Sequence, residues 1–329
     1  MAKHAARIAT CFAVLLLSAC ATRGPLIPAN LNVGVRASVE LDGTPFFPQS
    51  DYQCGPAALA TVLGASGVTA TPEALAPLVY IPARRGSLQV EMQAAPRKYG
   101  RLSYQLAPNL DSVLTELDAG RPVLVLHNYG VPFFPRWHYA VVVGYDAATD
   151  TVALRSGETR RQVLSARNFM RAWANGGRWA MVVLRPGETA ATAVPVRYLE
   201  AAADFERAAS PEVSRLVFDA AVQRWPSEAV AWIGRGTAEY RAGNLPAAAK
   251  DYAAALRVDG SNVGARNNLA MTLLDLGCPT RARAQLAQIN SDTLQPPLRE
   301  AVLDTRQRVE AAFGAAAGDD SATCRAPRD

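Results

Sequence analysis

One cysteine of the chain stands where an extended segment becomes a helix. Pro45 and Pro48 keep the segment before Cys54 extended, because proline disfavours the helical conformation in the residue that precedes it. Pro56 suits the first turn of a helix, and the apolar residues after it follow a helical spacing. Unpaired amides and the helix dipole favour an anion at a helix N-terminus. We therefore expect the Cys54 thiol to ionise readily and to act as a nucleophile. The amide of Gln49 would face an oxyanion formed beside the sulfur.

A thiolate enzyme also needs a base that pairs with the sulfur and returns a proton to the leaving group. Beyond the N-terminal segment, the chain has two histidines, His127 and His138. His138 opens an apolar stretch that predicts a strand, and there its side chain can project toward a neighbouring helix end. His127 closes the preceding predicted strand. We favour His138 as the base. The alternative is that Cys54 is a small buried residue and both histidines are ordinary polar residues at strand ends.

The CGPA run at Cys54 and the HYAVV run at His138, with Gln49 upstream, resemble the papain-like peptidases that remove double-glycine leader peptides from bacteriocins. The resemblance covers roughly residues 44–185. It implies a papain-like fold, a nucleophile at Cys54, a general base at His138 and an oxyanion-hole glutamine at Gln49. Gln49 lies one residue closer to the cysteine than in many relatives, and Gln53 is a less favoured substitute.

The resemblance leaves the third catalytic position open. The family places an aspartate on the strand after the histidine strand, whereas the corresponding segment here reads LRSGE and ends at Glu158. A third residue orients the imidazole and stabilises its charged form. Asp150, Ser156, Glu158 or a backbone carbonyl could take this place. A Cys–His dyad without it would work more slowly, and an inactive descendant that only binds peptides is the other interpretation.

The N-terminus has the pattern of a secretory signal peptide. Basic residues precede an apolar run from Ile8 to Leu17, which is too short to span a membrane, and small residues follow. The run ends in LSAC, which resembles the bacterial lipobox and implies cleavage before Cys20 and lipidation of its sulfur. Ala21 follows, rather than aspartate, and by the same resemblance this implies the outer membrane, with the protein facing the periplasm. Simple secretion is the alternative.

Changes of composition divide the rest of the chain. Residues 20–43 are predicted to be a tether and 44–185 a domain with helices first and an antiparallel sheet after, which is an α+β layout. Residues 186–196 indicate a linker, 197–313 are alanine-rich and helical, and 314–329 are predicted to be a disordered tail. Within the domain we predict helices after Cys54 and at 72–78, 87–99 and 110–117, then strands at 123–126, 138–145, 151–154 and 179–184.

Residues 197–313 repeat themselves every 34 residues. Gly243 and Gly277 lie one period apart, as do Tyr252 and Leu286. Small residues at such positions let paired helices approach, while large ones fill the space between pairs. The pattern, with two good repeats and one poor one, resembles the tetratricopeptide repeat. That resemblance implies a stacked helical array that binds a protein partner. An unrelated alanine-rich helical bundle is the alternative.

Other chemistries have little support in the sequence. The net charge of +5 comes from scattered Lys and Arg, so we expect no nucleic-acid partner. Two histidines and the lack of a ligand motif disfavour a catalytic metal, no glycine-rich phosphate loop is present, and we expect no cofactor. Cys278 and Cys324 form an even pair for an oxidising compartment, and whether they form a disulfide stays open.

The sequence therefore predicts a membrane-anchored periplasmic cysteine peptidase that cleaves a peptide or small protein, with a helical repeat region that binds protein. One alternative is a catalytically inactive peptidase fold that binds peptides. Another is a cell-wall amidase or endopeptidase. Those families usually carry Asp-Cys-Ser-Gly around the nucleophile, which the QCGP run at Cys54 does not match. Neither the substrate nor the partner of the repeats can be named from the sequence.

Overall fold

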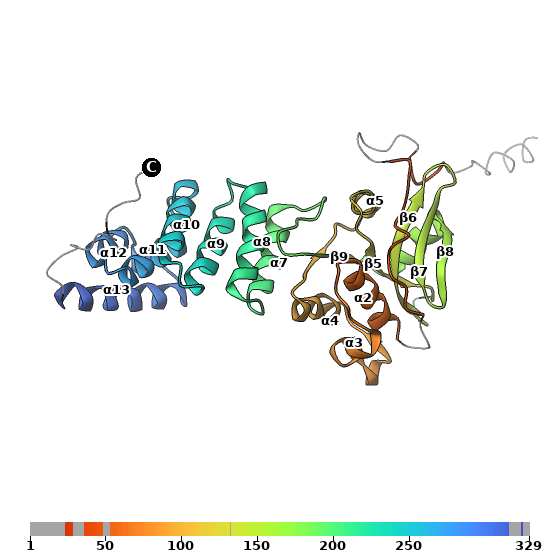
Figure 1. Ribbon diagram of the computed structural model, residues 1–329, viewed down its shortest axis with the longest axis horizontal. Coiled ribbons are helices and arrows are strands. Elements are labelled where there is room, and N and C mark those ends of the chain that lie inside the picture. Colours follow the sequence, from red (N-terminus) through yellow and green to blue (C-terminus); the bar gives the residue numbers. More distant parts are fainter. Residues whose placement is uncertain (1–23, 29–35, 49–52, 132, 316–323, 325–329) are drawn as a thin grey trace, which may run out of the picture.

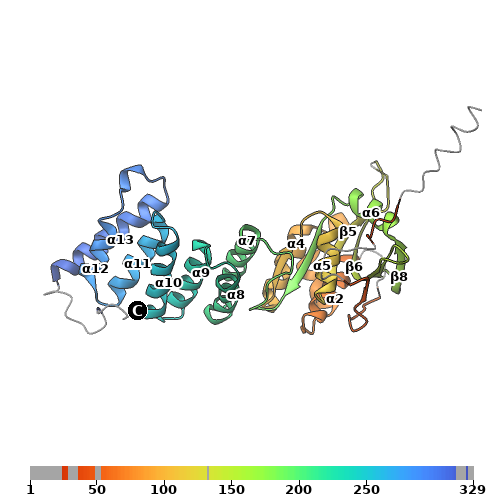
Figure 2. The ribbon, with the colours of Figure 1, turned by 90° about the horizontal axis from the view of Figure 1, so that it is seen from above.

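The chain folds into a domain built on a β-sheet, and a row of helices extends from one side of it (Figures 1 and 2). The computed structural model describes residues 24–28, 36–48, 53–131, 133–315 and 324. The predicted signal peptide, the predicted lipid attachment at Cys20 and the predicted oxyanion residue Gln49 lie outside these ranges. Among the helices so described, none is both long enough and apolar enough to cross a membrane.

The strands of the first domain form one antiparallel sheet and one short hairpin. The sheet contains β1 (Ser38–Glu40), β4 (Leu102–Gln105), β5 (Val123–Asn128), β6 (Trp137–Asp146), β7 (Thr151–Ser156), β8 (Thr159–Ser165) and β9 (Ala180–Leu184), and the hairpin contains β2 (Tyr80–Ile81) and β3 (Gly86–Ser87). The order is β4-β9-β5-β6-β7-β8, and β1 pairs with the end of β6 that β5 does not reach. At Gly144 of β6, an added Cβ would lie 2.5 Å from the Val39 carbonyl oxygen, so the close approach of β1 requires glycine.

The helices fall into two groups along the chain. The sheet domain contains α2 (Cys54–Ala65), α3 (Pro72–Val79), α4 (Gln89–Ala94), α5 (Leu110–Asp118) and α6 (Ala166–Asn175), with 3₁₀ turns at Pro82–Arg84 and Ala95–Tyr99. The helical region contains α7 (Pro195–Glu206), α8 (Pro211–Arg224), α9 (Ala229–Arg241), α10 (Leu245–Val258), α11 (Val263–Asp275), α12 (Pro279–Leu286) and α13 (Leu298–Ala315), with a 3₁₀ turn at Ser291–Thr293.

The sheet separates two apolar cores because successive side chains of a strand point to opposite faces. On one face, α2 packs against the row of β6 that includes Tyr139 and Val141, and α3 packs against α2 in the same core. On the other face, α5, α6 and α7 cover the sheet, packing mainly against β6, β5 and β4, in one core with Ala140 and Val142. This second core continues into the helical region through α8 as far as Ala231 of α9. The two parts of the chain therefore share one core.

The predicted α+β class of residues 44–185 is confirmed, but its boundaries shift. Part of the predicted tether belongs to the domain: Ile27 is fully buried, and residues 38–40 form β1. Part of the predicted linker is also packed, since the amide and hydroxyl of Thr192 donate to the buried Glu116 carboxylate. The helix predicted at 87–99 is divided, because Pro96 lacks an amide hydrogen and a 3₁₀ turn follows α4.

Neighbouring helices of the C-terminal region pack closely where small residues face large ones. An added Cβ at Gly234 of α9 would overlap the ring of Phe218 in α8. An added Cβ at Gly236 would lie 2.9 Å from the ring of Tyr252 in α10. The helical nature of this region is confirmed. Its assignment to the tetratricopeptide repeats stays a prediction.

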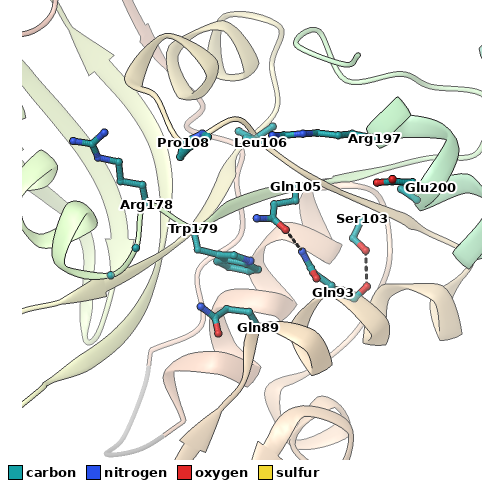
Figure 3. A pocket seen from close by; sticks show the side chains of 13 residues that line it. Gln89, Gln93, Ser103, Gln105, Leu106, Pro108, Arg178, Trp179, Arg197 and Glu200 are labelled. Atoms are coloured by element: carbon teal, nitrogen blue, oxygen red, sulfur yellow. Dashed lines mark hydrogen bonds between the residues drawn. The ribbon is translucent and has the colours of Figure 1, made fainter. Parts of the chain in front are cut away.

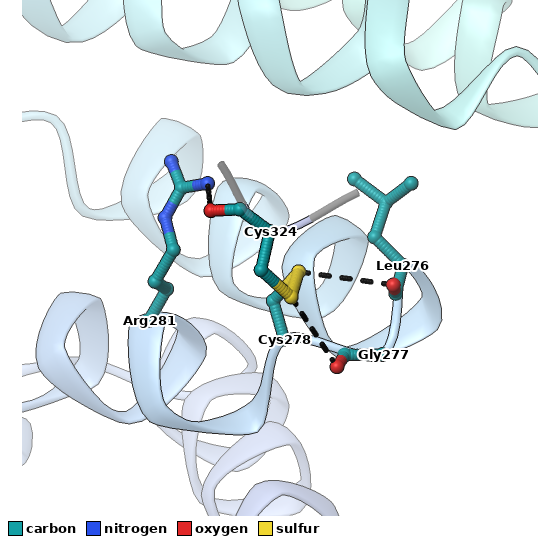
Figure 4. Close-up of a disulfide and its surroundings, with 5 residues drawn as sticks. All are labelled: Leu276, Gly277, Cys278, Arg281 and Cys324. Atoms are coloured by element: carbon teal, nitrogen blue, oxygen red, sulfur yellow. Dashed lines mark hydrogen bonds between the residues drawn. A yellow bond between two sulfur atoms is a disulfide. The ribbon is translucent and has the colours of Figure 1, made fainter. Parts of the chain in front are cut away.

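A disulfide joins the C-terminal segment to the start of α12. Cys278 and Cys324 are bonded, which resolves the alternative that the sequence left open (Figure 4). Arg281 of α12 donates a hydrogen bond to the Cys324 carbonyl oxygen at 2.8 Å, so a charged side chain also holds this residue. The bond encloses α13 within a covalent loop.

Candidate active site

Cys54 is the first residue of α2, the position that the sequence predicted. It is half-buried and packs beside the core between α2 and the sheet. It is also the free cysteine of the described chain, since Cys278 and Cys324 are bonded to each other. Gly55 lies so close to Ser87 of β3 that a Cβ would overlap the serine hydroxyl. The start of α2 is therefore held against the β2–β3 hairpin.

The environment of the Cys54 thiol differs from the sequence prediction. Burial raises the pKa of the thiol, while the backbone amides of Tyr139, Gly55 and Cys54 itself act in the opposite direction. The prediction of a readily ionised thiol is therefore wrong. The physical reason is that desolvation destabilises the thiolate more than the amides at the helix end stabilise it. In the resting protein the thiol is neutral at pH 7.

His138 lies at the start of β6, next to the residue whose amide faces the sulfur. Its Nε2 atom is 2.9 Å from the Oγ atom of Ser156, the last residue of β7. Within the described residues, Nδ1 of His138 makes no hydrogen bond. Burial lowers the pKa of His138, so the imidazole is neutral at pH 7. The ring is thus held by one nitrogen and leaves the other for proton transfer.

The thiol and the imidazole approach the same strand end from different sides. Tyr139 belongs to the sheet face covered by α2, and strand alternation places His138 on the opposite face. His127 of β5 lies directly opposite His138 of β6 in the strand pairing. It packs against Phe169 of α6, on the sheet face away from α2. The last regular pair of β6 and β7 is Val141 with Arg155, so the two strands part before they reach this end. The pairing of Cys54 and His138 as nucleophile and base stays a prediction.

Among the carboxylates and hydroxyls proposed for the third position, only Ser156 contacts His138. Asp150 lies in the β6–β7 turn, at the other end of both strands, and its Oδ1 accepts hydrogen bonds from the amides of Leu26 and Ile27. Glu158 is exposed in the β7–β8 turn. A serine hydroxyl can accept the Nε2 proton and fix the tautomer, but it carries no charge to stabilise an imidazolium.

His127 is a packed residue beside the candidate site. Its side chain is fully buried, and Nδ1 lies 2.8 Å from the Tyr129 hydroxyl. Burial lowers the pKa of His127 to about 3, with a smaller contribution from His138. The Tyr129 ring lies 5.9 Å from that of His138. His127 is thus a neutral residue that, through Tyr129, supports the wall beside His138.

The loop between β5 and β6 displays aromatic side chains next to His138. Asn128 Oδ1 accepts the amides of Gly130 and Arg136, which closes the loop at its base. Phe133 and Phe134 are 89% and 78% exposed at its tip. The sequence analysis did not single out this loop, although the FFPRW run is visible in the sequence. The exposed rings of Phe133 and Phe134 offer a contact for a substrate.

A cavity of about 580 Å³ lies between the sheet domain and the first helix of the helical region (Figure 3). Side chains of α4, β4 and α7 line it, together with Trp179, just before β9. No local pattern could have predicted it, because four distant segments supply its walls. Among the described residues, no three His, Cys, Asp or Glu side chains are grouped so that they could hold a metal ion.

Comparison with known proteins finds a family that is similar to the first domain. Residues 41–181 match the family described as the Peptidase C39 like family. The N-terminal domain is thus similar to the C39-like peptidases. The resemblance inferred from the CGPA and HYAVV runs is confirmed at this level, and it covers less than half of the chain.

Two solved structures are similar to this chain. A protein described as a C39-like peptidase from Bacillus anthracis has 16% identity and a TM-score of 0.38, with 46% of this chain and 98% of that one covered. The peptidase domain of Streptococcus ComA, a bifunctional ABC transporter involved in quorum sensing, has 19% identity and a TM-score of 0.34, with 43% and 98% covered. The search among curated proteins found no match.

Proposed function

We propose that the C39-like domain is a cysteine peptidase in which Cys54 attacks a peptide carbonyl and His138 transfers the proton. One observation supports this most directly. The residue next to His138 offers its amide to the Cys54 sulfur, while His138 itself is oriented by Ser156. A nucleophile, a base and an orienting residue are therefore gathered at one strand end, as acyl transfer requires.

The reaction begins from neutral groups. His138 Nδ1 takes the thiol proton as the sulfur bonds to the carbonyl carbon, and the carbonyl electron pair moves to oxygen. The Cys54 amide, and Gln49 by the resemblance, stabilise this oxyanion. The intermediate collapses to a thioester, and the leaving amine takes the proton from His138. Water, deprotonated by His138, then releases the acid and restores the thiol. Ser156 holds the imidazole throughout.

We also propose that the chain is a lipoprotein of the outer membrane, anchored through Cys20. The first described segment supports an orientation for it. Leu26 is bound to Asp150 at the end of β6 away from Cys54, and five residues separate Leu26 from Cys20. At about 3.3 Å per residue, the ten-residue strand β6 spans about 30 Å. A short anchor at Asp150 would therefore direct the active site away from the lipid surface.

The test is a comparison of peptides from cells that carry wild type and the Cys54→Ala variant. We expect products that occur only with wild type, and their ends identify the cleaved bond. Labelling of purified wild type by a thiol-directed peptidase inhibitor, absent in Cys54→Ala, supports the same conclusion. If wild type neither reacts with the inhibitor nor yields specific peptides, the peptidase function is refuted.

A non-catalytic peptide-binding function is the second candidate. Two observations favour it: burial raises the pKa of the Cys54 thiol, and a serine takes the place of the aspartate next to His138. Both weaken a nucleophile while leaving the fold intact. This function predicts that the Cys54→Ala protein keeps its binding and its cellular phenotype, whereas a peptidase loses the phenotype.

A further inference from the structure

The cavity at the domain junction lies close to the candidate active site. Tyr139, whose amide faces the Cys54 sulfur, packs edge-on against Trp179 with 5.8 Å between ring centroids. Trp179 lines the cavity. On the other side, Ser87 contacts Gly55 and accepts a hydrogen bond from the Tyr139 hydroxyl, and Gln89 of the cavity follows two residues later. One layer of side chains therefore separates the thiol from the cavity.

The cavity has a polar wall suited to a peptide. Gln93 donates a hydrogen bond to Gln105 at 2.8 Å, and Ser103 donates one to the Gln93 carbonyl oxygen, so this wall is pre-arranged (Figure 3). Gln89 projects beside Trp179 in the same view. Side-chain amides offer both donors and acceptors, which match the alternating groups of a peptide backbone. The apolar face of Trp179 adds a surface for a side chain.

The charges at the cavity are not balanced. Arg178 and Arg197 lie at its two ends, and Figure 3 shows Arg197 reaching from α7 toward Leu106. In the part of the chain that the structure describes, neither arginine nor Glu200 forms an ion pair. Two positive charges and one negative charge leave an excess of one positive charge. An acidic side chain, rather than a basic one, is therefore the charged group that the cavity would bind.

We propose that this cavity binds an extended substrate segment with an acidic side chain, on one side of the cleaved bond, and that α7 of the helical region forms part of this subsite. This subsite rests on the proposed peptidase function, because only a peptidase would treat the bound segment as a substrate. It gives the helical region a direct part in substrate selection. Each exposed ion pair of this kind changes affinity by about two- to fivefold.

A binding experiment tests the subsite without any cleavage. The full chain with Cys54→Ala is mixed with a peptide library digested from a bacterial proteome, and bound peptides are identified by mass spectrometry. We expect Asp and Glu to be enriched among them. Adding Arg197→Glu should abolish that enrichment and favour Lys and Arg. Arg171→Glu, a matched reversal on the exposed face of α6, should leave the enrichment unchanged. Bound peptides without acidic enrichment, or with an equal loss in both variants, would overturn the proposal.

A cleavage experiment separates this proposal from the peptidase function. Wild type and Arg197→Glu digest the same library, and the residues that flank each cut are counted. We expect an acidic preference on one side of the cut in wild type and its loss in Arg197→Glu, with the total number of cuts within about threefold. Acidic binding by the Cys54→Ala chain without any cleavage by wild type would refute the peptidase and retain the binding site. Cleavage with an unchanged preference in Arg197→Glu would refute the subsite and retain the peptidase.

Discussion

Replacing Ser156 by aspartate should activate the Cys54 thiol at neutral pH. In the wild type, burial keeps both partners neutral: it raises the pKa of Cys54 and lowers that of His138. A carboxylate at the position of the Ser156 hydroxyl, 2.9 Å from Nε2, would stabilise the imidazolium instead. The imidazolium would then stabilise a thiolate beside it. The variant therefore tests whether the thiol and the imidazole work as a pair.

The size of the effect follows from the hydrogen bond at His138. A hydrogen bond between neutral groups contributes about 1 kcal/mol, and one to a charged group about 1.5–3 kcal/mol. The difference is about 1–2 kcal/mol, and burial of the new carboxylate offsets part of it, because Ser156 is only 6% exposed. A net gain of about 1 kcal/mol raises the pKa of His138 by about 0.7 and multiplies the reactive thiolate about fivefold. Ser156→Ala should lower the reactivity by a similar factor.

The assay is the rate of alkylation of Cys54 by iodoacetamide between pH 6 and pH 10, followed by mass spectrometry of the peptide. Wild type should react slowly at pH 7, and its rate should still be rising at pH 9, because burial raises the pKa of the thiol. Ser156→Asp should react about five times faster at pH 7. Ser165→Asp provides the matched control, since Ser165 is exposed at the N-terminus of α6, where aspartate also caps a helix.

Equal rates for wild type and Ser156→Asp, in proteins of equal melting temperature, would refute the pairing of Cys54 with His138. So would an equal acceleration in Ser165→Asp, because the effect would then reflect the charge of the domain rather than the contact with His138. In either case the peptidase mechanism would have to be withdrawn, and peptide binding would become the favoured function.

Three further predictions concern stability. The pKa of His127 is about 3 in the folded chain and 6.5 in the unfolded chain, so between these values the unfolded chain binds one more proton. The free energy of unfolding should therefore be constant above pH 6.5 and fall by about 2 kcal/mol by pH 5. Urea midpoints measure this fall, which should be smaller for His127→Asn. Cys324→Ser removes the disulfide to Cys278, which closes a loop with a sequence separation of 46. We expect the free energy of unfolding to fall by up to about 4 kcal/mol. The last helices should melt at a lower temperature, and the alkylation of Cys54 should not change. Gly234→Ala should destabilise the protein by about 1–3 kcal/mol in a denaturant titration, because the added Cβ would overlap the ring of Phe218. Gly264→Ala has space for its Cβ and should be neutral or stabilising. Equal effects of the two substitutions would contradict the packing argument.

Local patterns determined where the main elements of the first domain lie. The residues after Cys54 have the spacing and the proline of a helix start, and α2 begins there. The apolar stretch after His138 is long enough to be a strand without help from its surroundings, and β6 contains it. By contrast, β8 begins with exposed polar residues, two adjacent arginines among them, and has few apolar residues, so only pairing with β7 makes it a strand. The sequence analysis missed it because that stabilisation comes from another segment.

Contacts between distant segments decided the chemistry of the site. The sequence placed Cys54 at a helix end and predicted a low thiol pKa, but burial by the packed sheet reverses the direction of the shift. The sequence also left three residues open for the third catalytic position. The divergence of β6 from β7 brings Ser156 to His138, whereas Asp150 lies at the other end of these strands. Helix starts and apolar strands depend on neighbours in sequence, so the sequence alone determined them. Desolvation, register and the cavity at α7 depend on neighbours in space, and only the tertiary structure could decide them.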